Sequence, residues 1–183
     1  GTSGVLMAMA GCATAPAVPR RELLLLRGGL VVTQDPVLKT FRGDVLVDNG
    51  RIAALGPTLS APAAEVVDCS NRIVMPGFIE THRHTWQSCL RHLGGNWSAA
   101  QYFAFNFFKF GVAFRPEDVY AANLMGRLAA LDGGITTLVD WSHIMNSPAH
   151  ADAAVQALRD AGGRSVFAMG WPQAPDPSRW IRN

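Results

Sequence analysis

The sequence changes its pattern at Pro76-Gly77, and this change limits the folds that the chain can adopt. After this dipeptide, short apolar segments typical of buried strands alternate with segments of helical periodicity. The expected strands cover 78–82, 135–140 and 165–169, and the expected helices cover 98–110, 116–132 and 148–161. Strands that alternate with helices form parallel sheets, because a parallel connection has to cross over the sheet. We therefore expect an α/β fold, and three such βα units begin a (β/α)₈ barrel, which usually takes about 250 residues.

The segment before Pro76 has the pattern of a small β layer. Its clearest feature is Asn49-Gly50 between two apolar runs, because this dipeptide tolerates the positive φ angles of a tight hairpin turn. The stretch 22–32 is expected to form a strand, a turn at Gly28-Gly29 and a second strand. The remaining expected strands cover 44–48, 51–56, 66–68 and 72–75.

Composition indicates a folded chain and argues against nucleic acid as a partner. Of the 183 residues, 49% are hydrophobic and 16% are charged, which is typical of a chain that buries much of its length. Sixteen basic and fourteen acidic side chains leave a formal charge of +2, without a run of Lys or Arg that could follow a polyanion. We therefore expect no nucleic acid as a partner.

Residues 1–19 are expected to be the remnant of an export signal and a linker. Residues 5–11 are apolar and small, and an Ala/Pro-rich stretch follows them, as signal processing requires. Met9-Ala10-Gly11-Cys12 also resembles the bacterial lipoprotein box, which makes Cys12 a lipidation candidate and a lipid anchor a candidate partner. The protein would then be periplasmic or membrane-anchored. The alternative is a disordered start of chance composition on a cytoplasmic protein.

The other two thiols, Cys69 and Cys89, lack the spacing of a Cys-x-x-Cys metal or redox motif. We expect both to be small buried apolar residues. A disulfide between them is compatible with an exported protein, although nothing in the sequence requires it.

His82 and His84 are the residues that point to chemistry. Residues two apart on a β-strand project from the same face, so both imidazoles at the end of the first predicted strand can face one ion. Arg83 is then expected to face away, whereas Glu80 has the same parity as the histidines. Barrel strands converge at their carboxyl ends, where later strands add further ligands. A bare His-x-His also occurs by chance on solvated loops, so this interpretation depends on the surrounding sequence.

The surrounding residues 73–84 read Ile-Val-Met-Pro-Gly-Phe-Ile-Glu-Thr-His-Arg-His, after the predicted hairpin. This order resembles the amidohydrolase superfamily, especially its cytosine deaminase and chlorohydrolase-like branch. In that family, a β-sandwich built from both chain ends flanks a (β/α)₈ barrel whose first strand ends in His-x-His. Residues 133–140 resemble the second barrel strand. The resemblance covers 21–170 and implies that 20–74 is part of the β-sandwich and that 75–183 holds the first three βα units of a truncated barrel.

The resemblance implies a metal-dependent hydrolase that cleaves a non-peptide carbon–nitrogen bond of a small-molecule substrate, such as a deaminase or a cyclic amide hydrolase. His82 and His84 would ligate a divalent metal, zinc or iron, with two later histidines and an aspartate. The remaining ligands and the proton-shuttling carboxylate would lie beyond residue 183, so no general base is assigned and Glu80 is interpreted as structural. The isolated chain is expected to be inactive and poorly soluble, because its third strand leaves an apolar edge uncovered.

Four more residues near the strand ends are candidates for the site. Trp86 and Gln87 follow the histidines into the first loop, where they either touch substrate or pack under the loop. His143 follows the second predicted strand and is either a substrate contact or a hydrogen-bonded loop histidine. Asp140, at the end of that strand, is a candidate to steady a ligand or a loop from behind the site.

Other catalytic motifs are absent from the sequence. It has no His-Glu-x-x-His, no Gly-x-x-x-x-Gly-Lys, no Gly-x-Gly-x-x-Gly and no Gly-x-Ser-x-Gly. The cysteine spacing excludes the zinc nucleobase deaminases of the Pro-Cys-x-x-Cys type. The competing hypothesis is a catalytically silent barrel portion or binding protein that retains the family framework. The sequence leaves substrate, metal identity and oligomeric state open.

Overall fold

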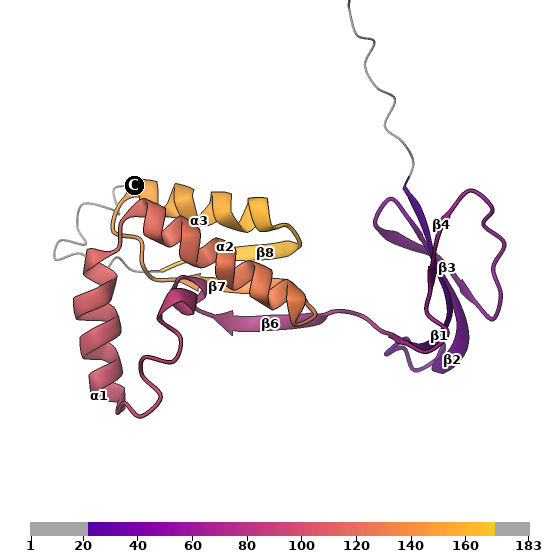
Figure 1. Cartoon of the computed structure of the whole chain (residues 1–183), viewed down its shortest axis with the longest axis horizontal. Helices are drawn as coiled ribbons and strands as arrows, with labels where there is room; N and C mark the ends of the chain where they lie inside the picture. The colour runs from indigo at the N-terminus through magenta and orange to yellow at the C-terminus, as the bar shows by residue number, and fades with distance from the viewer. Residues whose placement is uncertain (1–21, 171–183) are drawn as a thin grey trace, which may run out of the picture. The chain divides into compact units, whose positions relative to one another are not determined.

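The computed structural model describes residues 22–170. The chain divides into two compact units, the first ending at Pro76 and the second beginning at Gly77, and each contains its own sheet (Figure 1). The expected export segment, with Cys12, lies outside the described residues. Between residues 22 and 170, no helix is long and apolar enough to cross a bilayer.

The first unit is a five-stranded sheet of order β3-β2-β1-β4, with β5 also paired to β1. Its strands are β1 (Leu23–Val32), β2 (Thr40–Asp48), β3 (Arg51–Gly56), β4 (Glu65–Asp68) and β5 (Ile73–Val74). Asn49 and Gly50 join the antiparallel strands β2 and β3, and their φ angles of 48° and 74° are those of a tight hairpin turn. The predicted hairpin is therefore confirmed.

The predicted turn at Gly28-Gly29 is wrong. β1 runs on without interruption, and its ladder with β2 shifts register between Leu26 and Gly29. The glycines belong to a bulge, in which Gly28 has a φ of 74° and donates its N–H to the Asp44 carboxylate at 2.8 Å. A Cβ on Gly29 would meet Val74 at 2.7 Å. The glycine pair therefore admits a neighbouring strand and does not reverse the chain.

The second unit is a three-stranded parallel sheet of order β6-β7-β8. Its strands are β6 (Phe78–Arg83), β7 (Ile135–Ser142) and β8 (Arg164–Met169), and its long helices are α2 (Pro116–Asp132) and α3 (Pro148–Ala161). Each helix connects two consecutive strands, and Figure 1 shows both helices along the same side of the sheet. The predicted alternation of parallel strands and helices is confirmed. The carboxyl ends of all three strands therefore lie at one edge of the sheet.

The start and end of α2 follow from local chemistry. Pro116 lies in its first turn, where the missing N–H costs nothing. The Asp118 carboxylate accepts hydrogen bonds from the Arg115 guanidinium at 3.0 Å and from the Arg115 backbone N–H at 2.9 Å. These bonds lower the pKa of Asp118 from 3.8 to about 2, and the bond from the guanidinium has the largest effect. The helix ends at Gly133, as the sequence predicts.

The predicted helix over 98–110 is only partly an α-helix. The α-helix α1 (Ala99–Tyr102) is short, and a π-helix, η2 (Phe103–Gly111), continues it. A π-helix bonds residue i to residue i+5, which stacks side chains five positions apart. The rings of Tyr102 and Phe107 have this spacing, with centroids 5.7 Å apart, and the rings of Phe103 and Phe107, four positions apart, lie at 5.2 Å. The aromatic residues of this segment therefore contact one another at both spacings.

Cys69 is buried, as predicted, whereas Cys89 is exposed, and both are free thiols. The prediction of a buried residue is therefore wrong for Cys89. Because Trp86 fills the core behind the short 3₁₀ helix η1 (Thr85–Leu90), Cys89 is left at the surface of that helix.

The hydrophobic core of the second unit lies between the helices and the sheet. One cluster of its buried residues consists of Trp86, Val119, Ile144, Met145 and Ala154, and Phe167 of β8 packs against this cluster. On the opposite face, apolar side chains point to solvent, with Ile79 of β6 exposed by 69%, Trp141 of β7 by 50% and Val166 of β8 by 55%. Exposed apolar surface that spans neighbouring strands promotes association.

Replacing apolar residues on this face should reduce association of the chain. The double variant Ile79→Ser, Val166→Ser removes two exposed side chains and leaves the core intact, so binding of the hydrophobic dye ANS should fall and sedimentation should shift toward the monomer. Val37→Ser is the matched control, because Val37 is 84% exposed in the first unit. An equal loss of dye binding in the control would contradict the assignment of this face.

Candidate metal centre

The structure brings His82 and His84 together at the carboxyl end of β6. Their Nε2 atoms are 3.4 Å apart, and their rings meet edge to face with centroids 5.1 Å apart at an interplanar angle of 89°. His82 is the penultimate residue of β6, and His84 directly precedes η1. The two imidazoles thus project from the same side of the strand, and their Nε2 atoms lie close to each other.

This geometry fits two ligands of one divalent ion. In a tetrahedral zinc site with Zn–N bonds of about 2.0–2.1 Å, two ligand nitrogens lie about 3.3–3.4 Å apart. The separation of 3.4 Å between the histidine Nε2 atoms matches that edge. Across 22–170, no group of three or more His, Cys, Asp or Glu side chains is placed to hold an ion. The described chain therefore contributes the pair alone.

The backbone of β7 fixes which nitrogen of His84 is free. His84 Nδ1 lies 2.9 Å from the carbonyl oxygen of Trp141. A carbonyl only accepts, so Nδ1 carries a hydrogen, and in the neutral imidazole this leaves Nε2 with the lone pair that a metal needs. Metal-binding histidines usually have such a partner on the other ring nitrogen.

Trp141 also contacts the strand that carries the histidines. Its indole Nε1 donates to the carbonyl oxygen of Thr81 at 2.8 Å, and its ring lies against His82 with centroids 5.8 Å apart. The sequence interpretation did not include Trp141. The available signal was a bulky aromatic residue at the carboxyl end of the second predicted strand, between the candidates Asp140 and His143.

Asp140 is completely buried behind the histidine pair. One carboxylate oxygen accepts from the Thr85 backbone N–H at 3.1 Å, and the other accepts from the Asn123 side chain at 3.1 Å. Burial raises the pKa of Asp140, and the hydrogen bonds partly oppose that shift. Asp140 therefore ties the residue after His84 to β7 and to α2, and Asn123 is a further residue that sequence reasoning missed.

His143 lies between the pair and the π-helix. Its ring is edge to face with His84 at 4.3 Å between centroids and is stacked on Phe107 at 4.5 Å and 10°. Burial, with a smaller contribution from the His84 charge, lowers the pKa of His143 from 6.5 to about 4. The imidazole is therefore neutral at pH 7.

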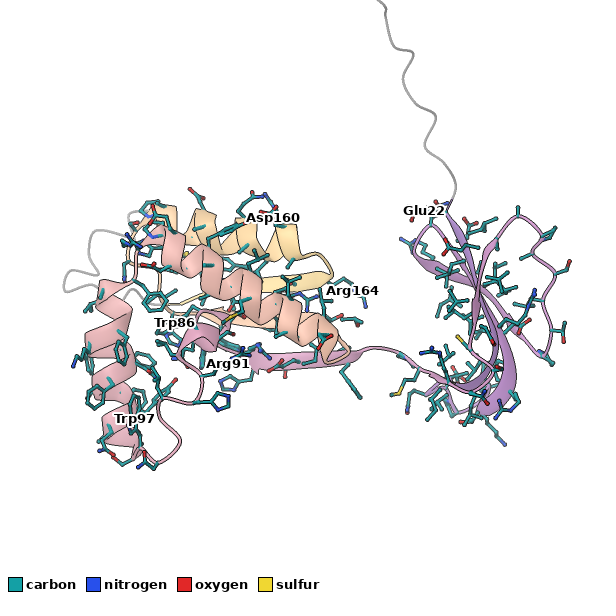
Figure 2. All side chains as sticks on the ribbon, in the orientation of Figure 1. Glu22, Trp86, Arg91, Trp97, Asp160 and Arg164 are labelled. Atoms are coloured by element: carbon teal, nitrogen blue, oxygen red, sulfur yellow. The ribbon has the colours of Figure 1, made fainter. Side chains whose placement is uncertain are left out.

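The two loop candidates have structural contacts. Trp86 is completely buried, with its ring against Phe114 at 5.1 Å, so the packing interpretation applies to it. Figure 2 labels Trp86 among the side chains of the second unit. Gln87 exchanges two hydrogen bonds with the Tyr102 hydroxyl, donating at 2.8 Å and accepting at 3.0 Å. That exchange ties η1 to α1.

Glu80 does not follow the expected parity. Its carboxylate accepts from the Arg83 guanidinium at 3.1 Å, although alternation places Glu80 with the histidines and Arg83 away from them. The ladder between β6 and β7 is irregular from Glu80 to Arg83, so strict alternation fails over this stretch. The ion pair agrees with a structural role for Glu80.

Asp140→Ala should destabilise the second unit, because it leaves the Thr85 N–H and the Asn123 amide buried without their acceptor. The expected loss is about 1–3 kcal/mol in the free energy of unfolding. Asp140→Asn should lose less than half as much, because Asn123 can rotate its amide and present Oδ1, which has no partner among the described residues. Urea titration followed by tryptophan fluorescence measures both values, since the tryptophans among residues 22–170, which are Trp86, Trp97 and Trp141, all lie in the second unit. Equal losses in the two variants would contradict this assignment.

The chain is similar to curated deaminases over most of its length, although no protein-family model matches it. A 5-methylthioadenosine/S-adenosylhomocysteine deaminase from Symbiobacterium thermophilum is 34% identical over 153 residues, which cover 81% of this chain and 34% of the relative. The chain thus spans about a third of the length of the curated relatives it matches.

Solved structures share the fold of the chain. An atrazine chlorohydrolase from Arthrobacter aurescens, complexed with zinc and atraton, matches with a TM-score of 0.69 at 25% identity, over 79% of this chain and 35% of that one. An adenosine deaminase from Xanthomonas campestris with bound zinc matches with a TM-score of 0.68 at 25% identity, over 78% of this chain and 33% of that one. The relatives in sequence and the neighbours in structure both support the resemblance of this chain to the amidohydrolase superfamily.

Proposed function

We propose that this chain forms part of a metal-dependent hydrolase that cleaves a non-peptide carbon–nitrogen bond. The observation that carries the proposal is the 3.4 Å separation of the His82 and His84 Nε2 atoms at the carboxyl end of a parallel strand. In this proposal β6, β7 and β8 are the first three strands of a (β/α)₈ barrel, whose strand ends gather the active site. The first unit is then a portion of the flanking β-sandwich.

Zinc is the metal we propose for the pair, with iron as the alternative. The pair has the nitrogen spacing of a tetrahedral zinc site, and the two solved structures described above hold zinc. Such an ion, with one position open, would supply a hydroxide nucleophile near neutral pH.

The residues of the chain orient the site. His84 presents Nε2 because its Nδ1 is committed to the Trp141 carbonyl. Asp140 holds the backbone just after His84 through Thr85. The ring of His143 closes one side of the pair. These contacts fix the donors before any ion binds, which lowers the cost of assembling the site.

We infer small aminated heteroaromatic compounds as the substrate class and deamination as the reaction, with hydrolysis of a cyclic amide as the alternative. The similar proteins named above are deaminases of adenosine-type compounds and a chlorohydrolase bound to atraton.

A catalytically silent barrel portion or binding protein is the second candidate. The observation that favours it is that residues 22–170 place only two donors for an ion. An enzyme needs further ligands and a general base from other chain segments, whereas a silent protein needs neither.

Export, with a lipid anchor on Cys12, also belongs to the proposal, and mass spectrometry of the membrane fraction for acylated Cys12 tests it.

Removing the pair should abolish metal binding. Equilibrium dialysis of the wild-type chain should give about one zinc ion per chain, and the double variant His82→Ala, His84→Ala should fall to background. His92→Asn is the control, because it removes an exposed imidazole and Asn tolerates the φ of 72° at that position. Unchanged zinc occupancy in the double variant would remove the assignment of the site.

Activity should depend on segments that complete the site. The 183-residue chain alone should release no ammonia from 5-methylthioadenosine, and strong turnover by it would contradict this expectation. A hybrid in which 22–170 replaces the matching third of the Symbiobacterium deaminase should release ammonia, and His82→Ala with His84→Ala should abolish that release. A folded, zinc-loaded hybrid without turnover would favour the silent protein.

A further inference from the structure

The sheet ladder is interrupted beside the histidine pair. β6 and β7 pair at Glu80 with Leu138 and at Arg83 with Asp140, and the register shifts between these points. Thr81 and His82 therefore lie where regular backbone pairing lapses. Without another partner, the carbonyl groups of this stretch would have no fixed place against β7.

The Trp141 side chain bridges the interruption. Its indole N–H donates to the Thr81 carbonyl at 2.8 Å, immediately before His82, while its own carbonyl accepts from His84 Nδ1 at 2.9 Å. One residue of β7 therefore holds the chain on both sides of His82. The indole ring also lies 5.8 Å from the His82 ring, tilted by 46°.

We propose that Trp141 is a positioning residue for the metal-binding pair, and that its indole N–H bond to Thr81 sets the angle between the two imidazoles. The proposal rests on the proposed function, in which His82 and His84 bind the ion. Trp141 is 50% exposed, so it contributes less to the core than a buried tryptophan such as Trp86. Its contacts are concentrated on the residues around the pair.

Two replacements separate the N–H bond from the ring. Trp141→Phe keeps an aromatic ring and removes the donor. β-(3-benzothienyl)alanine at position 141 keeps the shape of the indole and replaces its N–H by sulfur, so it preserves the packing if the shorter phenylalanine ring disturbs the fold. Trp97→Phe is the control, because Trp97 stacks on Phe105 and not on the pair.

The experiment measures cobalt(II) binding to the full chain, because the visible absorption of bound cobalt reports the geometry of its ligands. Both replacements at Trp141 should weaken cobalt binding about tenfold, the lower end of the effect of residues that orient metal ligands. At saturating cobalt, their absorption bands should also shift from those of the wild type. Thermal unfolding of the metal-free chain should change little. Trp97→Phe should retain the affinity and the spectrum of the wild type.

The results distinguish the two proposals. If the benzothienyl variant binds cobalt with the affinity and spectrum of the wild type while His82→Ala does not bind, the positioning role of the N–H is overturned and the metal site stands. A lower affinity that comes with an unchanged spectrum and earlier unfolding would also overturn it, because that is the effect of lost stability alone. If His82→Ala and His84→Ala leave cobalt binding intact, the proposed metal site itself fails.

Discussion

The hydrogen bond between His84 Nδ1 and the Trp141 carbonyl is the contact on which the candidate site depends. It joins the strand that carries the histidines to the next strand, and it determines which ring nitrogen has a lone pair to offer. Because the acceptor is the backbone carbonyl oxygen of Trp141, the sheet fixes its position, and no side-chain rotamer has to be selected for it. The geometry of the pair is thus a property of β6 and β7 together.

Parallel topology makes this contact available. The carboxyl ends of β6 and β7 lie at one edge only because α2 carries the chain back across the sheet. The same helix supplies Asn123, which donates to the buried carboxylate of Asp140, and that carboxylate holds the Thr85 N–H. Helix, strand and loop are therefore connected behind the histidines by polar bonds that burial makes costly to break.

Local patterns allowed the strand and helix order, the turn at Asn49-Gly50 and the pairing of the two histidines to be predicted, since each rests on short-range geometry. Features that depend on tertiary neighbours could not be predicted in the same way. Gly28-Gly29 forms a bulge because another strand approaches it, and Trp86 is buried because two helices close over it. The proposed positioning role of Trp141 depends on the irregular pairing of the neighbouring strand β6, and no local pattern of residues predicts that irregularity.

The apolar face of the second unit and the histidine pair meet at Trp141. Trp141 belongs to the exposed face with Ile79 and Val166, and its ring also borders His82. Chain segments that cover this face would therefore be the ones in reach of the open side of the pair. If those segments also supplied metal ligands, the free energy of metal binding and that of burying apolar surface would favour the same folded state. Occupancy of the site and stability of the sheet would then be thermodynamically linked, because an ion that binds the covered state more tightly than the uncovered state stabilises the covered state.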